Sequence, residues 1–442
     1  MPNQTHNPAI KSWVSSANSS SADFPIQNLP IGVFRKRGEN GPGRVGIAIG
    51  NEVLPIQPLR ERVQFEGPAA QAANSCNSAS LNALMALGTT AWTAFRQRLF
   101  ELLRNDSAKR NEHRSAVGPL LVPMHDVEML LPAQIGDYTD FYASIFHAIN
   151  VGRMFRPENP LFPNYKNLPI GYHGRSSSIV VDGTPVRRPV GQTKNDTSET
   201  PEVGPSRSLD YELEVGFFIG PGNALGERIP IDKAEEHIFG VCLLNDWSAR
   251  DIQKWEYQPL GPFLAKNFAT TISPWVVTLE ALEPFRTAAF TRGADDPSPL
   301  PYLASKANDA RGGIDLTLEV FLMTEKMQRE RIPPHLVSKG SFRDMYWTIA
   351  QMLAHHTVNG CNLRSGDLLG SGTVSGPTKE SLGCFLEVTR AGSEPIGLQG
   401  GETRKFLQDG DKVLFRGYCT KEGFARIGFG DCSGTIIPAK QQ

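Results

Sequence analysis

The sequence lacks features that mark several common classes of protein. Its 45 Lys and Arg residues balance 46 Asp and Glu residues, and the formal net charge of −1 offers no electrostatic footprint for nucleic acid or an anionic membrane. No apolar run approaches the ~20 residues that a membrane span needs. The P-loop and the H-E-x-x-H and G-x-S-x-G motifs are also missing. We therefore expect a soluble protein with no nucleic-acid or membrane partner, and the missing motifs narrow the range of enzyme chemistries.

Cysteine is scarce, and nothing in its spacing predicts pairing. The six cysteines are scattered without a C-x-x-C pair, and the N-terminus "MPNQTHNPAIKSW" lacks the apolar run of a signal peptide. Disulfides are rare in reducing compartments. We therefore expect six reduced thiols in a cytoplasmic protein.

Glycine and proline, by contrast, are abundant. The 42 glycines and 33 prolines make up about 17% of the chain, against a usual total of about 12%. They follow no fixed period, which indicates many turns between short strands. The chain of 442 residues is also longer than one ordinary core accommodates. We therefore predict two domains in a mostly β fold with some α.

The texture of the sequence divides the chain into three parts. Residues 1–22 are polar and Ser-rich, which predicts a flexible N-terminal arm. Residues 23–130 begin with short apolar pieces between Gly and Arg and predict a small β-domain. In that domain, "AWTAFRQRLFELLRN" predicts an amphipathic helix. Its apolar stripe consists of Trp92, Phe95, Leu99 and Leu102. Residues 131–442 contain mainly strand candidates and form the predicted larger domain.

Two helices interrupt the strand candidates of the larger domain. In "SFRDMYWTIAQMLAHHTVNG", Ser341 and Asp344 fit a capping box and predict the start of a helix. A second capping box, formed by Ser248 and Asp251, predicts a helix that begins in "NDWSARDIQKWEY". The segment "CFLEVTRAG", by contrast, is among the strand candidates.

Three carboxylates in "SLDYELEVGFF" are the first candidates for a functional site. Asp210, Glu212 and Glu214 occupy alternate positions, so one continuous strand would place them on one face. One interpretation of this pattern is a solvated face on an edge strand. The apolar residues around them instead favour a buried strand, where unpaired carboxylates would be prohibitively unfavourable. A hard divalent cation such as Mg²⁺ or Ca²⁺ would resolve that conflict, because it takes oxygen ligands.

Further polar residues follow in two other segments. Asp246 ends an apolar strand candidate. It either faces a cleft or is simply the residue at the entry of the next helix. On that helix, Arg250 and Gln253 share a face. The segment "IGDYTDFYASIFHAINVGRMFR" is dense in polar groups, among them Asp140 and His147. A lone histidine of this kind is more often structural than catalytic.

Several long segments resemble the fumarylacetoacetate hydrolase family. They include "IGDYTDFYASIFHAINVGRMFR", "LDYELEVGFFIGPGN", "HIFGVCLLNDWSARDIQKWEYQPLGPFLAKNFATTISPWVV" and "MYWTIAQMLAHHTVNGCNLRSGDLLGSGTVSGP". The resemblance covers nearly the whole chain. It implies a small N-terminal SH3-like β-domain, a larger C-terminal mixed β-roll domain and a homodimer. The implied reaction is hydrolysis of a carbon-carbon bond in 4-fumarylacetoacetate to give fumarate and acetoacetate, the last step of tyrosine and phenylalanine catabolism.

The resemblance also implies roles for individual residues. The metal site, for Mg²⁺ or Ca²⁺, is formed by Asp140, Glu212, Glu214 and Asp246 and lined by Lys266 and Thr270. The implied general base is His147, oriented by Glu387. The group that stabilises an oxyanion consists of Arg250, Gln253 and Lys266. Contacts with the substrate are expected from Tyr142, Arg156, Tyr172, Gln253, Tyr257 and Thr373. Asp210 is left as a residue behind the ligands or on the surface.

The sequence leaves two other functions open. Another metal-dependent enzyme of the superfamily, such as an acylpyruvate hydrolase, a decarboxylase or a hydratase, would share Glu212, Glu214 and Asp246. A non-catalytic binding protein with the same fold would be expected to lack His147 or Glu387, and both are present.

Overall fold

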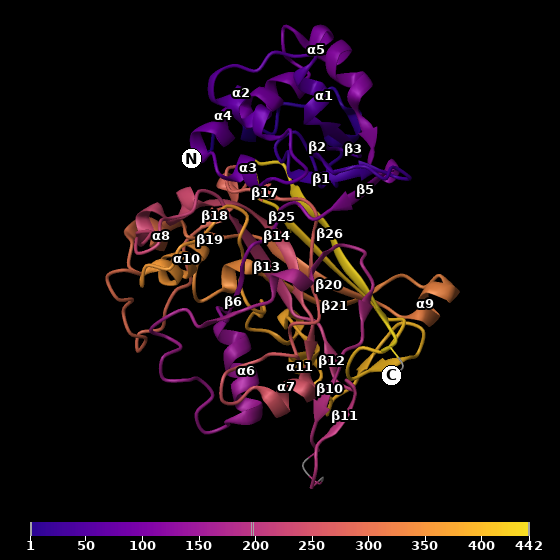
Figure 1. Cartoon of the computed structure of the whole chain (residues 1–442), viewed down its shortest axis with the longest axis vertical. Helices are drawn as coiled ribbons and strands as arrows, with labels where there is room; N and C mark the ends of the chain where they lie inside the picture. Colours follow the sequence, from indigo (N-terminus) through magenta and orange to yellow (C-terminus); the bar gives the residue numbers. More distant parts are fainter. Residues whose placement is uncertain (1, 196, 198, 441–442) are drawn as a thin grey trace.

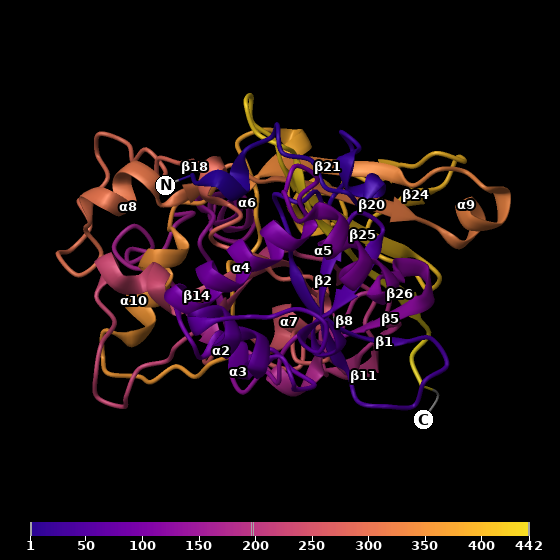
Figure 2. The ribbon, with the colours of Figure 1, turned by 90° about the horizontal axis from the view of Figure 1, so that it is seen from above.

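The computed structural model describes residues 2–195, 197 and 199–440. Helix and strand each account for 27% of the chain, so the fold is mixed α/β and the predicted predominance of β structure is wrong. A smaller N-terminal part sits on one end of a larger C-terminal part (Figure 1). Seen from above, the N-terminal helices and strands lie over the larger part, from which α9 projects at one side (Figure 2).

The N-terminal part contains an antiparallel sheet of five strands in the order β4-β3-β2-β1-β5. Its strands are β1 (Ile31–Lys36), β2 (Arg44–Ile49), β3 (Glu52–Pro55), β4 (Val122–Pro123) and β5 (Val127–Leu130). The helices are α1 (Ile56–Arg60), α2 (Gly67–Ser75), α3 (Asn82–Met85), α4 (Thr89–Leu103) and α5 (Arg110–Val117). The predicted amphipathic helix is confirmed as α4, because the whole predicted stripe is buried.

The N-terminal segment is packed against this part, so the prediction of a flexible arm over residues 1–22 is wrong for residues 2–22. It forms two 3₁₀ helices, η1 (Gln4–His6) and η2 (Ser15–Asn18). Ile10 and Val14 are buried among the residues of the N-terminal core. The Ser12 hydroxyl also donates a hydrogen bond of 2.9 Å to the carbonyl of Leu103 at the end of α4. The prediction failed because a few buried apolar residues hold this segment in spite of its serine-rich composition. Residue 1 of the predicted arm lies outside the described residues.

Two large sheets form the C-terminal part. The first has the order β7-β6-β22-β13-β14-β16-β8, with β17 also paired to β14. Its strands are β6 (Tyr138–Phe141), β7 (Gly171–His173), β8 (Ile179–Val181), β13 (Leu213–Ile219), β14 (Ile238–Asp246), β16 (Thr270–Ile272), β17 (Val277–Thr278) and β22 (Leu368–Gly370). The second has the order β21-β20-β25-β26-β9. Its strands are β9 (Val186–Arg187), β20 (Thr317–Met323), β21 (His335–Ser341), β25 (Lys412–Cys419) and β26 (Ile427–Ile437).

The two sheets pack closely around a common core. A Cβ added at Gly417 of β25 would lie only 2.7 Å from Leu243 Cδ2 of β14, so a glycine allows this close approach. Trp247 and Phe415 are fully buried in the same core. The rigid, apolar interior therefore supports β13 and β14, the two central strands that carry candidate site residues.

Helices and strand pairs complete the C-terminal part. The helices are α6 (Ile145–Phe155), α7 (Arg250–Glu256), α8 (Lys306–Arg311), α9 (Glu325–Glu330), α10 (Ile349–Thr357) and α11 (Phe385–Val388). The two-stranded pairs join β10 (Val190–Thr193) to β11 (Glu202–Pro205), β12 (Leu209–Asp210) to β15 (Ser248–Ala249), β18 (Arg286–Thr287) to β19 (Gly313–Ile314) and β23 (Ile396–Gly397) to β24 (Thr403–Arg404). Among the described residues, no helix combines the length and apolar character that a membrane crossing requires. All six cysteines are free thiols, as predicted.

The helix predicted from Ser341 begins later. Ser341 caps only a single 3₁₀ turn, η8 (Phe342–Asp344), through a hydrogen bond from the backbone N–H of Arg343. The capping box of α10 is formed instead by Thr348 and Gln351. Both sites fit the local pattern, and the tertiary fold uses the second for the longer helix.

The two remaining local predictions are also corrected. Ser248 belongs to β15, so α7 starts at Arg250, and the carboxylate of Asp251 accepts hydrogen bonds from Ser206 and Arg207 instead of capping at Ser248. The strand candidate "CFLEVTRAG" contains the short helix α11. In both places, contacts with segments far away in the sequence decide the local conformation.

Candidate metal centre and active site

The alternating carboxylates lie at a break between two strands. Asp210 ends β12, which pairs with β15, whereas β13 starts at Leu213 and pairs with β14 and β22. All three carboxylates are buried, and the exposed fraction of both Asp210 and Glu214 is 0%. The solvated face on an edge strand is therefore excluded.

Four carboxylates converge on one point at the centre of the first sheet. Oxygen atoms of Asp140, Glu212, Glu214 and Asp246 all lie within 4.8 Å of one another. Asp140 comes from β6, Glu214 from β13 and Asp246 from the end of β14, while Glu212 lies just before β13. A glycine in β22 provides the room, because a Cβ at Gly370 would lie 2.9 Å from Asp140 Oδ1 and 3.0 Å from Glu214 Oε2. The sheet thus assembles residues that are over 100 positions apart in the sequence.

Two cations partly neutralise this acidic cluster. The ammonium of Lys266 contacts Glu212 Oε2 at 2.5 Å and Asp246 Oδ2 at 2.7 Å. Arg250 adds an ion pair with Glu212 Oε1 at 2.8 Å. Burial by itself would raise the pKa of Glu212, but the charges of Lys266 and Arg250 outweigh it and lower this pKa to about 2. Glu212 is therefore ionised and firmly held.

On the other side of the cluster, Asp140 and Glu214 form no ion pair with a described residue, and only the more distant charge of Lys266 acts on them. Burial, together with neighbouring carboxylates, raises the pKa values of Asp140 and Glu214 well above their ordinary range. Asp140 Oδ1 and Glu214 Oε1 are buried without a hydrogen-bond partner in the described part of the chain. An unpaired buried carboxylate is strongly unfavourable, and a hard cation with oxygen ligands removes the penalty. The donor set therefore fits a divalent metal ion.

Three more predicted residues surround the carboxylates. The Tyr172 hydroxyl lies 3.1 Å from Asp140 Oδ2 and 2.9 Å from Asp246 Oδ2, so its single proton is shared between the two carboxylates. Thr270 Oγ1 is 3.4 Å from Asp246 Oδ1. Lys266 lines the cluster as predicted, but an ammonium has no lone pair and so cannot ligate a metal. A cavity of about 400 Å³ borders Tyr172, Lys266 and Thr270.

A buried histidine and glutamate form a second group. His147 lies in the first turn of α6, where its backbone N–H donates to the N-cap hydroxyl of Ser144. Its Nδ1 is 2.7 Å from Glu387 Oε2. Burial opposes ionisation of Glu387, yet contact with His147 and other donors lowers its pKa. A carboxylate at Nδ1 fixes the ring and leaves Nε2 available to a reacting group.

Three hydrogen-bond donors around Glu387 were not predicted from the sequence. Asn150 donates to Oε1 at 2.8 Å, while Ser375 and Cys384 donate to Oε2 at 2.7 Å and 3.2 Å. The i, i+3 spacing from His147 was the available signal for Asn150. The other two reach Glu387 only through the fold, so no local pattern marks them.

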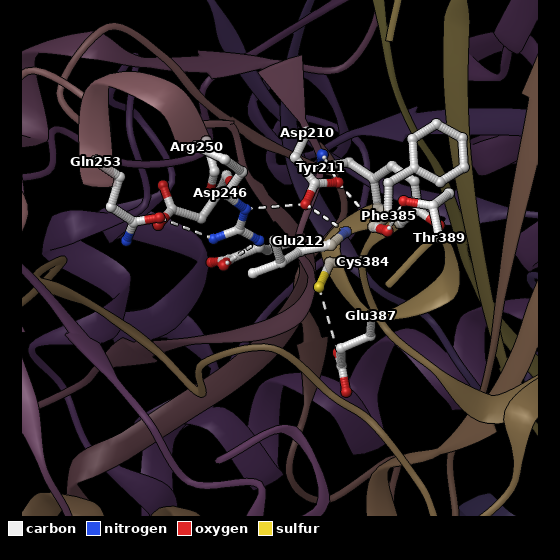
Figure 3. A network of polar contacts seen from close by, with 12 residues as sticks. Asp210, Tyr211, Glu212, Asp246, Arg250, Gln253, Cys384, Phe385, Glu387 and Thr389 are labelled. Carbon is white, nitrogen blue, oxygen red and sulfur yellow. Dashed lines mark hydrogen bonds and ion pairs between the residues drawn. The ribbon is translucent and has the colours of Figure 1, made fainter. Parts of the chain in front are cut away.

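Arg250 and Gln253 share a face of α7, as predicted. Arg250 Nη1 donates to Gln253 Oε1 at 3.1 Å, and Nε donates to Asp210 Oδ2 at 2.9 Å (Figure 3). Arg250 thus lies between Asp210 and Glu212, with Gln253 beside it (Figure 3). Asp210 is a residue behind the candidate ligands, and the alternative position on the surface is wrong.

The remaining candidate substrate residues are placed less uniformly. The ring of Tyr142 lies edge-on to His147, with centroids 5.3 Å apart, and burial raises the pKa of its hydroxyl. The charge of Arg156 acts on the same tyrosine, while its guanidinium stacks 4.0 Å from the ring of Phe162. Thr373 is buried, whereas Tyr257 is 39% exposed after the end of α7. The structure therefore places Tyr142 beside His147, stacks Arg156 on Phe162 and leaves Tyr257 on a surface.

The fold and the site together define a chain of two parts with a buried carboxylate cluster suited to a metal, next to a His-Glu pair. Residues 138–437 match the description "Fumarylacetoacetate (FAA) hydrolase C-terminal", and residues 27–132 match "Fumarylacetoacetase N-terminal". The chain belongs to the fumarylacetoacetate hydrolase family.

Curated relatives match along nearly their whole length. A protein named fumarylacetoacetase from Homo sapiens is 51% identical over 423 residues, which cover 95% of this chain and 98% of that protein. Its namesake from Caenorhabditis elegans is 51% identical over 433 residues, with 97% and 100% covered. The one from Dictyostelium discoideum is 50% identical over 429 residues, with 96% and 97% covered. Both parts of the fold are therefore shared with these relatives.

Proposed function

We propose that this protein is an enzyme that hydrolyses a carbon-carbon bond of 4-fumarylacetoacetate to release fumarate and acetoacetate, the last step of tyrosine and phenylalanine catabolism. The observation that carries the proposal is the buried four-carboxylate cluster near the His147-Glu387 pair. It occurs in a chain about half identical to proteins named for this reaction. A superfamily relative that acts on another diketo acid is the alternative.

The metal in this proposal is Mg²⁺ or Ca²⁺. Asp140, Glu212, Glu214 and Asp246 would hold it, because both ions prefer carboxylate oxygens. When bound, the ion supplies positive charge that lowers the free energy of the enolate leaving group. Lys266 and Thr270 shape the surroundings, and Tyr172 orients two of the carboxylates by hydrogen bonding.

His147 is the proposed general base. With Nδ1 held by Glu387, Nε2 takes a proton from the water whose oxygen attacks the substrate carbonyl. The carbon-carbon bond then breaks, its electron pair leaves with the acetoacetate fragment as an enolate, and a proton completes that product. Glu387 stabilises the imidazolium that forms, and three further donors fix this carboxylate in place.

Three residues are proposed to stabilise the oxyanion. Gln253 Oε1 accepts from Arg250, so its amide N–H₂ group, which has no partner among the described residues, can donate to a developing negative charge. Arg250 and Lys266 contribute positive charge, part of which Glu212 and Asp246 already neutralise. The side chains proposed to contact the terminal carboxylates and oxygens of the substrate are Tyr142, Arg156, Tyr172, Gln253, Tyr257 and Thr373.

Several expectations remain predictions. They are the homodimer, the cytoplasmic location, the domain limits 23–130 and 131–442, and the description of the two parts as SH3-like and β-roll. Residues 196, 198, 441 and 442 of the larger part lie outside the described residues.

The first test is a spectrophotometric assay of 4-fumarylacetoacetate loss by the purified protein, before and after EDTA and with Mg²⁺ or Ca²⁺ added back. Release of fumarate and acetoacetate that depends on the metal supports the proposal. The variant His147→Ala should lower kcat by about 10²–10⁴-fold, the contribution of a general base, without changing metal affinity. His125→Ala, at an exposed position of the N-terminal part, is the control. Full activity of His147→Ala would remove this residue from the mechanism, and no turnover by the metal-loaded wild type would reject the substrate.

A further inference from the structure

Asp210 is a fully buried carboxylate to which the proposed reaction gives no role. Its Oδ1 accepts hydrogen bonds from the backbone N–H groups of Tyr211 and Phe385, both at 2.8 Å. Its Oδ2 accepts from the N–H of Leu386 and from Arg250 Nε, both at 2.9 Å. All four neighbours are donors, which leaves no position for a proton on either oxygen, so the side chain is a carboxylate.

On one side, Asp210 holds the start of the helix that carries Glu387. Phe385 and Leu386 are the first two residues of α11, and the N-cap residue Cys384 makes no side-chain capping bond. The first N–H groups of a helix need acceptors, and the carboxylate of Asp210, at the end of β12, provides them for α11. Glu387 lies one residue further on, so the orientation of the His147-Glu387 pair depends on this cap.

On the other side, Asp210 fixes the guanidinium of Arg250. The planar fork of Arg250 directs Nε to Asp210, Nη2 to Glu212 and Nη1 to Gln253. Because the guanidinium is planar and rigid, the hydrogen bond at Nε also fixes the directions of Nη1 and Nη2. Asp210 thereby determines where Arg250 meets the candidate metal ligand Glu212 and how it orients the amide of Gln253.

We propose that Asp210 is a positioning residue that keeps the two halves of the active site in register. One half is the general base with its glutamate, and the other is the arginine with the carboxylate and amide that it contacts. Figure 3 shows Asp210 between Arg250 on one side and the Cys384–Phe385 segment on the other. This inference rests on the proposed function, because it assigns Asp210 to the same site.

Only an ionised aspartate satisfies all four donors. An asparagine at position 210 has nearly the same shape, but its N–H₂ group must face two donors in either orientation. It opposes Arg250 Nε and Leu386 N–H in one orientation, and the N–H groups of Tyr211 and Phe385 in the other. In either orientation Asp210→Asn therefore removes one of the two acceptors at the start of α11, and in one orientation it also removes the acceptor of Arg250 Nε, while it conserves volume.

The chain offers a matched control for this substitution. Asp411 is also fully buried, and it accepts hydrogen bonds from Arg404 Nε at 2.8 Å, Arg404 Nη2 at 2.9 Å and the backbone N–H of Gln408 at 2.8 Å. None of these partners belongs to the site. Asp411→Asn thus disturbs a buried aspartate-arginine pair of the same chemistry elsewhere in the domain.

The experiment compares both variants with the wild type, all loaded with Mg²⁺. Asp210→Asn should lower kcat by about 10–100-fold, the loss typical of residues that orient a metal site, with a much smaller change in KM. The downfield ¹H NMR resonance of the His147 Nδ1–H···Glu387 hydrogen bond, assigned by its loss in His147→Ala, should shift or broaden. Asp411→Asn should lower the melting temperature but leave kcat and this resonance unchanged.

Two outcomes would overturn the inference. One is an Asp210→Asn protein with wild-type kcat and an unchanged resonance, and the other is an equal loss of kcat in Asp411→Asn. If Asp210→Asn does not fold, Asp210→Ser replaces it with the same expected result, because its shorter hydroxyl carries no charge for Arg250 or for the first N–H groups of α11. If the wild type does not hydrolyse 4-fumarylacetoacetate, the proposed function fails, while the NMR comparison still tests Asp210.

Discussion

At the scale of single residues, the site depends on charges that are compensated unequally. Glu212 has two cationic partners, and its pKa falls to about 2. Glu214 accepts one hydrogen bond, from the backbone N–H of Gly372 at 3.0 Å, and keeps an unpartnered oxygen among the described residues. Removing the charge of Glu214 therefore affects mainly what the cluster binds, whereas removing that of Glu212 would also take one of their two anionic partners from Lys266 and from Arg250.

Glu214→Gln should weaken metal binding without unfolding the protein. The amide is isosteric and can still accept from Gly372 N–H, but one charged ligand is lost. We expect the Kd for Mg²⁺ or Mn²⁺, measured by isothermal titration calorimetry, to rise by at least about tenfold, since even partners behind the ligands contribute this much. Glu128→Gln, which affects only an ion pair with Arg35 in the N-terminal part, should leave Kd unchanged. An unaltered Kd in Glu214→Gln would exclude Glu214 as a ligand.

At the scale of elements, the N-terminal segment acts as part of the core. Ile10 is 7% exposed and belongs to the same apolar cluster as Leu99 and Leu103 of α4. Ile10→Ala should lower stability by about 2 kcal/mol or more, the usual range for truncating a buried isoleucine. The midpoint of urea unfolding, followed by tryptophan fluorescence, measures the loss. Val203→Ala, at a position that is 64% exposed, should shift this midpoint hardly at all. Equal midpoints for both variants would mean that the segment contributes no packing.

Elements with a strong local pattern were predictable, and those decided by distant partners were not. The stripe of α4 and the end of β14 at Asp246 follow from apolar spacing. In contrast, the strand carrying Asp210 stops because β12 pairs with β15, which also delays the start of α7 to Arg250. The segment around Glu387 was a strand candidate, but Asp210 provides the cap of a helix there. The resemblance named the four carboxylates, whereas the donors around Glu387 needed the fold.

At the scale of the whole molecule, the two parts meet through both backbone and side chains. Ile31 of β1 and Val276 exchange two backbone hydrogen bonds, of 3.0 Å and 2.8 Å. Trp92 of α4 packs edge-on against Phe239 of β14, with ring centroids 5.1 Å apart. Because β14 also ends at Asp246, the N-terminal part packs on one of the strands that build the carboxylate cluster. Strain in the cluster is therefore expected to affect the stability of the whole chain.

Metal removal should accordingly destabilise the folded protein. Without a cation, Asp140 and Glu214 remain buried next to other carboxylates, and unfolding relieves their repulsion. A ligand that binds only the folded state stabilises it by about 2.7 kcal/mol at a concentration of 100 times Kd. We expect the melting temperature in differential scanning calorimetry to fall with EDTA and to rise steadily with the logarithm of Mg²⁺ concentration. Glu214→Gln should flatten this rise and should melt higher than the wild type in EDTA, because it removes one repelling charge. A wild-type melting temperature that does not respond to Mg²⁺, Ca²⁺ or Mn²⁺ would contradict the assignment of the cluster as a metal site.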